Sequence, residues 1–238
     1  MKVLTYEDKA YPSFRKKLYR RAIPSGALSA TVADIVGEVG KRGDRALIDF
    51  AAKFDGAKLT VKSLRVSEDE LEFARSSVSA ETKSAVAASL KNIHAFAKKS
   101  LRKNWSSKNA QGAIVGERFV PFDRVGVYVP GGKAPLVSTS LMTAGFAQAA
   151  GVPEIVAATP PRADGSVNAE LLYALDAAGA TEIYKAGGAH GIAALSLGTK
   201  SIAPVDKVFG PGNSYVVEAK RQMVGAVSID LLPGPSEI

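Results

Sequence analysis

Cysteine is absent from this chain of 238 residues, and histidine occurs only twice, as His94 and His190. Without cysteine the chain has no disulfide, no thiolate metal site and no cysteine nucleophile. The two histidines stand about a hundred positions apart, so the chain holds neither an HExxH motif nor a histidine cluster. A catalytic metal would therefore need ligands from elsewhere.

Long apolar runs are lacking as well. Glycine, proline or lysine interrupts every weakly polar stretch within about 12 residues, short of the roughly 18 apolar residues of a membrane span. The first residues, 1–8, contain no apolar segment followed by a small-residue cleavage site, so no secretory signal is predicted. We expect a soluble, cytoplasmic protein without a membrane partner.

Three familiar sequence motifs are missing. The loop Gly210-Pro211-Gly212-Asn213 departs from the dinucleotide fingerprint GxGxxG, because Tyr215 stands where the third glycine belongs. The chain also contains no GxxxxGK[ST] phosphate loop and no GxSxG nucleophile elbow. ATP hydrolysis and serine hydrolase chemistry are therefore not indicated.

The net charge of +8 arises partly from a basic cluster beside Trp105. Its members are Lys98, Lys99, Arg102, Lys103 and Lys108. Basic residues at the end of a helix favour the negative end of its dipole, and a solvated basic face is commoner than a nucleic-acid site. We predict no nucleic-acid partner, although a positive field attracts a phosphate-bearing cofactor.

The first part of the chain is predicted to be mainly helical. Ser67 followed by Glu70 forms a capping box that begins one helix, and a helix of about 18 residues is expected after Ser79. Gly43 is expected to restart a helix that Gly56 ends. We assign residues 1–110 to a helical region that packs on a sheet domain formed by residues 111–238.

The hydrophobic period changes near residue 113. Alternation over 113–129 predicts a hairpin or strand pair that leads into the sheet, with a turn at Pro121-Phe122-Asp123. Short apolar runs then alternate with helical segments, which is typical of parallel strands joined by right-handed crossovers. The further strands are expected at 154–159, 182–186, 206–209 and 227–231, and the helices near 138–150, 167–178, 189–197 and 213–224.

An internal repeat supports this fold class. The segment 149–156, AAGVPEIV, is answered by 177–184, AAGATEIY. In each copy a glycine suits the left-handed position past a helix end, and Glu-Ile opens a strand. We predict an α/β protein with a parallel, Rossmann-like, doubly wound sheet.

Glycine and proline collect after five of the expected strands, at 129–132, 159–161, 187–191, 210–213 and 233–237. Ligands of open parallel sheets bind outside the carboxyl ends of the strands, where glycine permits close backbone approach. Turn formation alone explains one or two such loops well, but it explains five less well. The sequence therefore predicts one ligand crevice at this edge.

Three segments together resemble histidinol dehydrogenase: RVGVYVPGG at 124–132, VDKVFGPGN at 205–213 and IDLLPGPSE at 229–237. The resemblance extends over essentially the whole chain, including KRGD at 41–44, KFD at 53–55 and EAKRQ at 218–222. It implies a zinc- and NAD-dependent enzyme that oxidises L-histidinol through histidinaldehyde to L-histidine, in the last steps of histidine biosynthesis. It also implies intertwined homodimers with active sites shared between subunits.

The resemblance assigns site residues position by position. Tyr128 and Asn213 match NAD-contacting positions, and Ser236 matches a substrate-contacting position. His190 stands where the family usually has a cofactor-contacting glutamine, and histidine can still donate or accept one hydrogen bond. We expect these four side chains to meet at one rim of the sheet.

Family members are nearly twice this length and carry their zinc ligands and a Glu-His general-base pair downstream of the Pro-Gly-Pro-Ser-Glu segment. We therefore expect the zinc ligands and catalytic residues in an absent downstream part, and no turnover of histidinol by this chain alone. Two alternatives stay open: a related dehydrogenase of another polar alcohol, for which His190 is the distinguishing feature, and a non-catalytic nucleotide-binding or assembly module.

Overall fold

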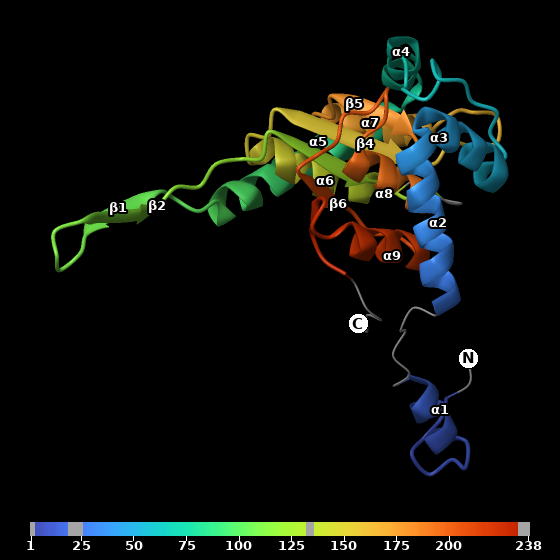
Figure 1. Ribbon diagram of the computed structural model, residues 1–238, viewed down its shortest axis with the longest axis horizontal. Coiled ribbons are helices and arrows are strands. Elements are labelled where there is room, and N and C mark those ends of the chain that lie inside the picture. Colours follow the sequence, from blue (N-terminus) through green and yellow to red (C-terminus); the bar gives the residue numbers. More distant parts are fainter. Residues whose placement is uncertain (1–2, 19–25, 132–135, 233–238) are drawn as a thin grey trace.

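A computed structural model describes residues 3–18, 26–131 and 136–232. It contains a five-stranded sheet, a separate two-stranded hairpin and helices on both faces of the sheet (Figure 1). The elements follow the order α1 (Tyr11–Leu18), α2 (Gly26–Arg42), α3 (Asp44–Phe50), η1 (Ala51–Asp55), α4 (Glu68–Ser77), α5 (Ala80–Ser100), β1 (Trp105–Lys108), β2 (Ile114–Glu117), β3 (Arg124–Tyr128), α6 (Val137–Ala149), β4 (Glu154–Thr159), α7 (Ala169–Ala177), β5 (Glu182–Lys185), α8 (Gly188–Leu197), β6 (Lys207–Phe209), α9 (Ser214–Met223) and β7 (Ser228–Ile229).

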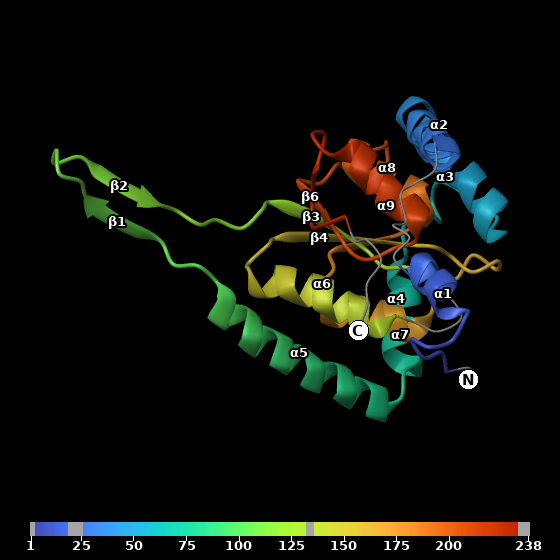
Figure 2. The same ribbon diagram turned by 90° about the horizontal axis from the view of Figure 1, so that it is seen from below.

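The five-stranded sheet is parallel throughout, with the order β5-β4-β3-β6-β7. The chain builds outward from β3 through β4 to β5, then returns to lay β6 on the other side of β3. Helices α6 and α7 cover one face, and α8 and α9 cover the other (Figure 2). The predicted parallel, doubly wound α/β fold is therefore confirmed.

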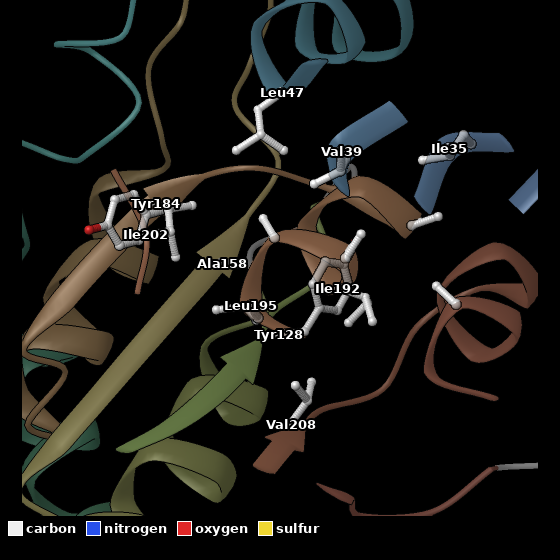
Figure 3. Packing of buried hydrophobic residues seen from close by; sticks show 14 of the residues in the cluster. Ile35, Val39, Leu47, Tyr128, Ala158, Tyr184, Ile192, Leu195, Ile202 and Val208 are labelled. Carbon is white, nitrogen blue, oxygen red and sulfur yellow. The ribbon is translucent and has the colours of Figure 1, made fainter. Parts of the chain in front are cut away.

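Two hydrophobic cores lie on opposite faces of the sheet. Successive residues of β3 alternate between them, because side chains of a strand point to opposite faces: Val125 and Val127 join one core and Tyr128 joins the other. Figure 3 shows the core of Tyr128, in which this residue of β3 and side chains of β4, β5 and β6 pack with Ile192 and Leu195 of α8. The strands are buried on both faces, as is typical of parallel sheets.

The helices before the sheet form an outer layer on both sides. Helices α2 and α3 pack on α8, and α2 also contacts α9, whereas α4 contacts α7 and α5 contacts α6. The predicted capping box begins α4: the Ser67 hydroxyl accepts from the amide of Glu70, whose carboxylate accepts from the amide of Ser67. The helix expected after Ser79 spans Ala80–Ser100.

The internal repeat has the predicted conformation. Gly151 and Gly179 follow α6 and α7 with φ of 81° and 85°, the left-handed region that glycine enters without strain. Each glycine turns the chain from a helix into the next strand, β4 or β5.

One predicted pairing was wrong. Strand β2 pairs antiparallel with β1, with Trp105 opposite Glu117 and Lys108 opposite Ile114, and it does not pair with β3. The hairpin lies well away from the sheet (Figures 1 and 2), and both of its strands are exposed. The alternation over 113–129 showed extended chain but not its partner, because Asn109 and Gly112 form the hairpin turn and Pro121 does not. The proposed boundary at residue 110 falls within this turn.

Strand β7 is shorter than predicted. It comprises Ser228 and Ile229 alone, because only Lys207 and Val208 of β6 lie opposite it at the sheet edge. The other strands begin and end within one residue of the expected bounds. Within the described ranges, no helix combines the length and the apolar character needed to cross a lipid bilayer.

Candidate functional site

The sheet reverses its strand order between β3 and β6, which lie side by side and leave toward opposite faces. In open α/β sheets such a switch point leaves a crevice outside the carboxyl ends of the two strands. Here β3 ends at Tyr128, and β6 leads into the loop Gly210-Pro211-Gly212-Asn213. The two loops therefore diverge and leave space between them.

A cleft of about 880 Å³ occupies this position. Four of the five loops expected to meet contribute to it, through Gly131, Pro160, Gly188 and Gly212 among others. The fifth loop, 233–237, lies outside the described residues, and so does Ser236. The remaining walls come from α2 and from the end of η1.

Tyr128 lines the cleft from the end of the central strand. Its side chain is almost fully buried, and its hydroxyl accepts a hydrogen bond from the amide of Gly188 at 2.9 Å. Burial raises the pKa of Tyr128 to about 12, and the negative charge of Asp55 adds to this effect. The phenol therefore stays protonated near neutral pH, and it joins β3 to the start of α8.

His190 lies in the first turn of α8 and is 2% exposed. Its ring packs against Phe50 and Phe54, with centroid separations of 5.5 and 6.1 Å. The Nε2 atom is buried and has no hydrogen-bond partner among the described residues. Burial lowers the pKa of His190 to about 4, so the imidazole is neutral at physiological pH.

Asn213 lines the cleft at the start of α9. Its side-chain oxygen accepts from the amides of Tyr215 and Val216, at 3.0 and 3.2 Å, and so caps the helix. Asparagine is a favoured residue at this position because it satisfies amides that have no partner within the helix. Capping occupies the oxygen of Asn213, which leaves the amide nitrogen as its available donor.

The loop that carries Asn213 is tied to the last strand. The buried ammonium of Lys220 donates to the carbonyl of Gly210 and to the carboxylate of Asp230, both at 2.5 Å. Asp230 in turn accepts from the amide of Gly210 at 2.9 Å. Gly210 has φ of 121°, and a Cβ there would lie 2.1 Å from the carbonyl oxygen of Tyr128. Only glycine allows this approach of β6 to the end of β3.

The structure therefore brings together Tyr128, His190 and Asn213 at one cleft. It also adds residues that sequence reasoning did not assign to the site, notably Phe54 and Asp55 of η1. One signal in the sequence could have found Asp55: an acidic residue just before the Gly56 helix end opposes the helix dipole. A side chain kept at such an unfavourable position is a candidate for a role outside the helix.

A second large cavity, of about 910 Å³, lies between α5 and α6. Its walls are mainly apolar, and it is removed from the carboxyl ends of the strands. It contains none of the side chains predicted for the site, so we assign the site to the switch-point cleft. In the part of the chain that the structure describes, no group of three or more His, Cys, Asp or Glu side chains could hold a metal ion.

Comparisons with known proteins agree on one family. The family model described as histidinol dehydrogenase matches residues 18–238. Histidinol dehydrogenase of Symbiobacterium thermophilum is 42% identical over 98% of this chain and 53% of its own length. That of Geobacillus kaustophilus is 46% identical over 92% of this chain and 52% of its own length.

A solved structure agrees with the sequence matches. The crystal structure of histidinol dehydrogenase from Elizabethkingia anophelis superposes with a TM-score of 0.86 at 37% sequence identity, over 94% of this chain and 52% of that chain. This chain thus spans about half the length of the relatives it matches. Sequence and fold agree, and the chain belongs to the histidinol dehydrogenase family.

Proposed function

We propose that this chain is the cofactor-side part of an NAD-dependent histidinol dehydrogenase, which oxidises L-histidinol to L-histidine through histidinaldehyde. The observation that carries the proposal is the convergence of Tyr128, His190 and Asn213 on the switch-point cleft. These residues would bind NAD, and Ser236 would contact the substrate. NAD supplies the acceptor for the hydride that leaves the alcohol carbon.

The cleft suits a dinucleotide in three respects. Its volume falls within the usual range for small-molecule sites, and its aromatic and proline walls suit flat rings. The first turn of α8 has no side-chain cap and lines the cleft; the amide of Gly188 donates to Tyr128, and those of Ala189 and His190 would donate to a phosphate group. The unpaired Nε2 of His190 offers one further hydrogen bond.

Zinc has no counterpart in the described part of the chain, where no suitable group of ligands exists. We propose that its ligands, and the general acid and base, belong to residues that the relatives carry beyond the matched half. No catalytic residue is therefore assigned here. The proposal also includes a cytoplasmic homodimer for the full-length enzyme.

Two measurements test this function. Isothermal titration of the purified chain with NAD should detect binding, and Tyr128→Phe, which removes the hydroxyl that holds Gly188, should weaken it. Incubation of the chain with histidinol, NAD and zinc should give no NADH. Measurable NADH under these conditions would contradict the assignment of catalysis to a downstream part.

Identifying the chemical class of the alcohol substrate requires activity measurements on the full-length protein. Its activity with histidinol should exceed its activity with other amino or sulfonated alcohols. A preference for one of the other alcohols would favour the related dehydrogenase, with His190 in place of the usual glutamine as the distinguishing residue. Absence of both NAD binding and activity after addition of a downstream half would favour a non-catalytic module.

A further inference from the structure

Two residues that line the cleft each carry a buried polar atom with no hydrogen-bond partner among the described residues: Oδ2 of Asp55 and Nε2 of His190. Most buried polar side-chain atoms in folded proteins are hydrogen-bonded, and leaving one unpaired costs about 1–3 kcal/mol. Both atoms belong to residues that line the same cleft, whereas the other buried unpaired atoms of the described residues, on His94, Arg124, Ser140 and Thr159, belong to residues that do not line it. Two such atoms at one cavity indicate a ligand that pairs with them.

Asp55 reaches the cleft through an irregular helix. Helix α3 continues as the π-helix η1, Ala51–Asp55, which ends at Gly56 with φ of 70°. Helical turns of this wider kind are rare, and they occur frequently at functional sites. Here the wider turn carries both Phe54 and Asp55 to the cleft wall. A carboxylate at a helix carboxyl end is unfavourable for the helix itself.

The surroundings of Asp55 limit what it can bind. Burial raises the pKa of Asp55 to about 6, so the carboxylate is charged above neutral pH and acts only as an acceptor. None of the described residues that line the cleft is basic. Its neighbours there include the neutral imidazole of His190 and the protonated phenol of Tyr128. The missing partner is therefore a donor on the ligand, and an anionic group at this point would be repelled.

We propose that Asp55 is a specificity-determining residue of the cleft, whose carboxylate accepts a hydrogen bond from an N–H or O–H group on the nucleoside part of the cofactor. The Nε2 atom of His190 pairs with the same nucleoside part of the cofactor. This inference rests on the proposed function, because it takes NAD as the occupant. Two groups on adenosine have the required chemistry, the exocyclic amino group of adenine and the hydroxyls of the ribose.

The test compares three nucleotides at pH 8, where Asp55 is ionised and Tyr128 is not. NAD has both donors. Its analogue with unsubstituted purine in place of adenine lacks the amino group and gains no other donor, and NADP replaces the ribose 2′-hydroxyl with a phosphate. Isothermal titration of the 238-residue chain and of Asp55→Asn gives six dissociation constants. The asparagine keeps the shape of the side chain and adds a donor.

If the adenine amino group pairs with Asp55, the wild-type chain binds the purine analogue about 10-fold or more weakly than NAD, and Asp55→Asn reduces that preference, because its neutral amide oxygen accepts a weaker hydrogen bond than the carboxylate. If a ribose hydroxyl pairs with it, the discrimination is against NADP, and Asp55→Asn reduces it by a similar factor. Either pattern supports the inference. Equal NAD-to-analogue ratios for wild type and variant with both analogues would overturn it.

The matched control is Asp49→Asn. Asp49 lies on α3, six residues before Asp55, but its exposed carboxylate pairs with Arg42 and does not line the cleft. Its dissociation constants should equal those of the wild type. Thermal unfolding verifies that both variants fold. Failure of the wild-type chain to bind NAD at all is a separate result, which would contradict the proposed function itself and the inference with it.

Discussion

Two residues that line the cleft, Asp55 and His190, carry buried polar atoms without a hydrogen-bond partner among the described residues. Tyr128 is paired through its hydroxyl with Gly188, whereas His190 keeps an unpaired nitrogen inside an aromatic wall. In the folded chain, His190 is therefore neutral at moderate pH. Burial disfavours the charged imidazole, so the free energy of unfolding falls once the pH is low enough to protonate His190 in the unfolded chain.

Stability should fall in acid because of His190. Its pKa of about 4 in the folded chain lies below the ordinary value of 6.5, so between these pH values the unfolded chain binds more protons. The contribution is fully present above pH 6.5 and is lost as pH falls toward 4, by up to about 3 kcal/mol. Urea unfolding of wild type and His190→Gln at several pH values measures it.

Asp55 has the opposite effect on the pH dependence of stability. Its folded pKa of about 6 lies above its ordinary value of 3.8, so stability falls as pH rises between these values, by a smaller amount because the carboxyl is half-buried. The two groups partly cancel in the wild type between pH 4 and 6. His190→Gln should therefore gain stability in acid relative to the wild type, and a parallel pH profile for both proteins would contradict the assignment.

Alanine substitutions at Gly210 and Gly225 distinguish the cost of a positive φ from the cost of a steric clash. Both have positive φ, 121° and 101°, but a Cβ at Gly210 meets the Tyr128 carbonyl while one at Gly225 meets nothing within 4 Å. Gly225→Ala should cost about 1–2 kcal/mol and leave NAD affinity unchanged. Gly210→Ala should cost more and weaken NAD binding, because the loop must move. Urea unfolding and titration calorimetry measure both effects.

At the scale of elements, local signals predicted helix starts well. Ser67 with Glu70, and Ser79 before α5, are side-chain caps that act within three residues, so the sequence alone identifies them. The hairpin partner of β2 was missed because the alternation of apolar and polar residues in one strand is the same whichever strand pairs with it. The π-helix was missed because residues 44–55 have an ordinary helical pattern.

Helix α9 and strand β7 should hold the Gly210 loop through Lys220. Replacement of Lys220 by methionine removes the only ammonium paired with the partly buried Asp230 carboxylate among the described residues, and it removes a donor to the Gly210 carbonyl. We expect a loss of about 3 kcal/mol in the free energy of unfolding, and weaker NAD binding.

The control for this prediction is Arg42→Met. Arg42 forms exposed pairs with Glu38 and Asp49, and such pairs contribute little to stability. Its unfolding free energy should stay within about 1 kcal/mol of the wild type. A Lys220→Met protein as stable as this control would show that the Lys220–Asp230 pair does not secure the loop.

The whole molecule consists of a sheet between two layered cores and an arm that joins neither. The arm, β1-β2, follows α5 and precedes β3, and its exposed apolar residues include Trp105 and Ile114. An isolated two-stranded hairpin is marginally stable in water. Its amides should therefore open far more easily than those of the central strands.

Hydrogen exchange should resolve this difference in one experiment. Amides of β1 and β2 are expected to exchange within seconds, whereas those of β3 and β4, which are buried on both faces, exchange at the rate of global unfolding. Mass spectrometry of peptides from the exchanged chain gives both values. Protection of the arm equal to that of β3 would mean that it packs on a surface, in this chain or in a second copy.

The sequence by itself determined the fold class and most element bounds, because periodicity, caps and glycine turns act over a few residues. The family was indicated separately, by the resemblance of three glycine-containing segments. The sequence also placed Tyr128, His190 and Asn213 near one edge, since the carboxyl ends of parallel strands meet there. Only the tertiary structure showed that η1 carries Asp55 into the same cleft, and that the nitrogen of His190 is unpaired. Burial and missing partners depend on packing between distant segments, which no local pattern contains.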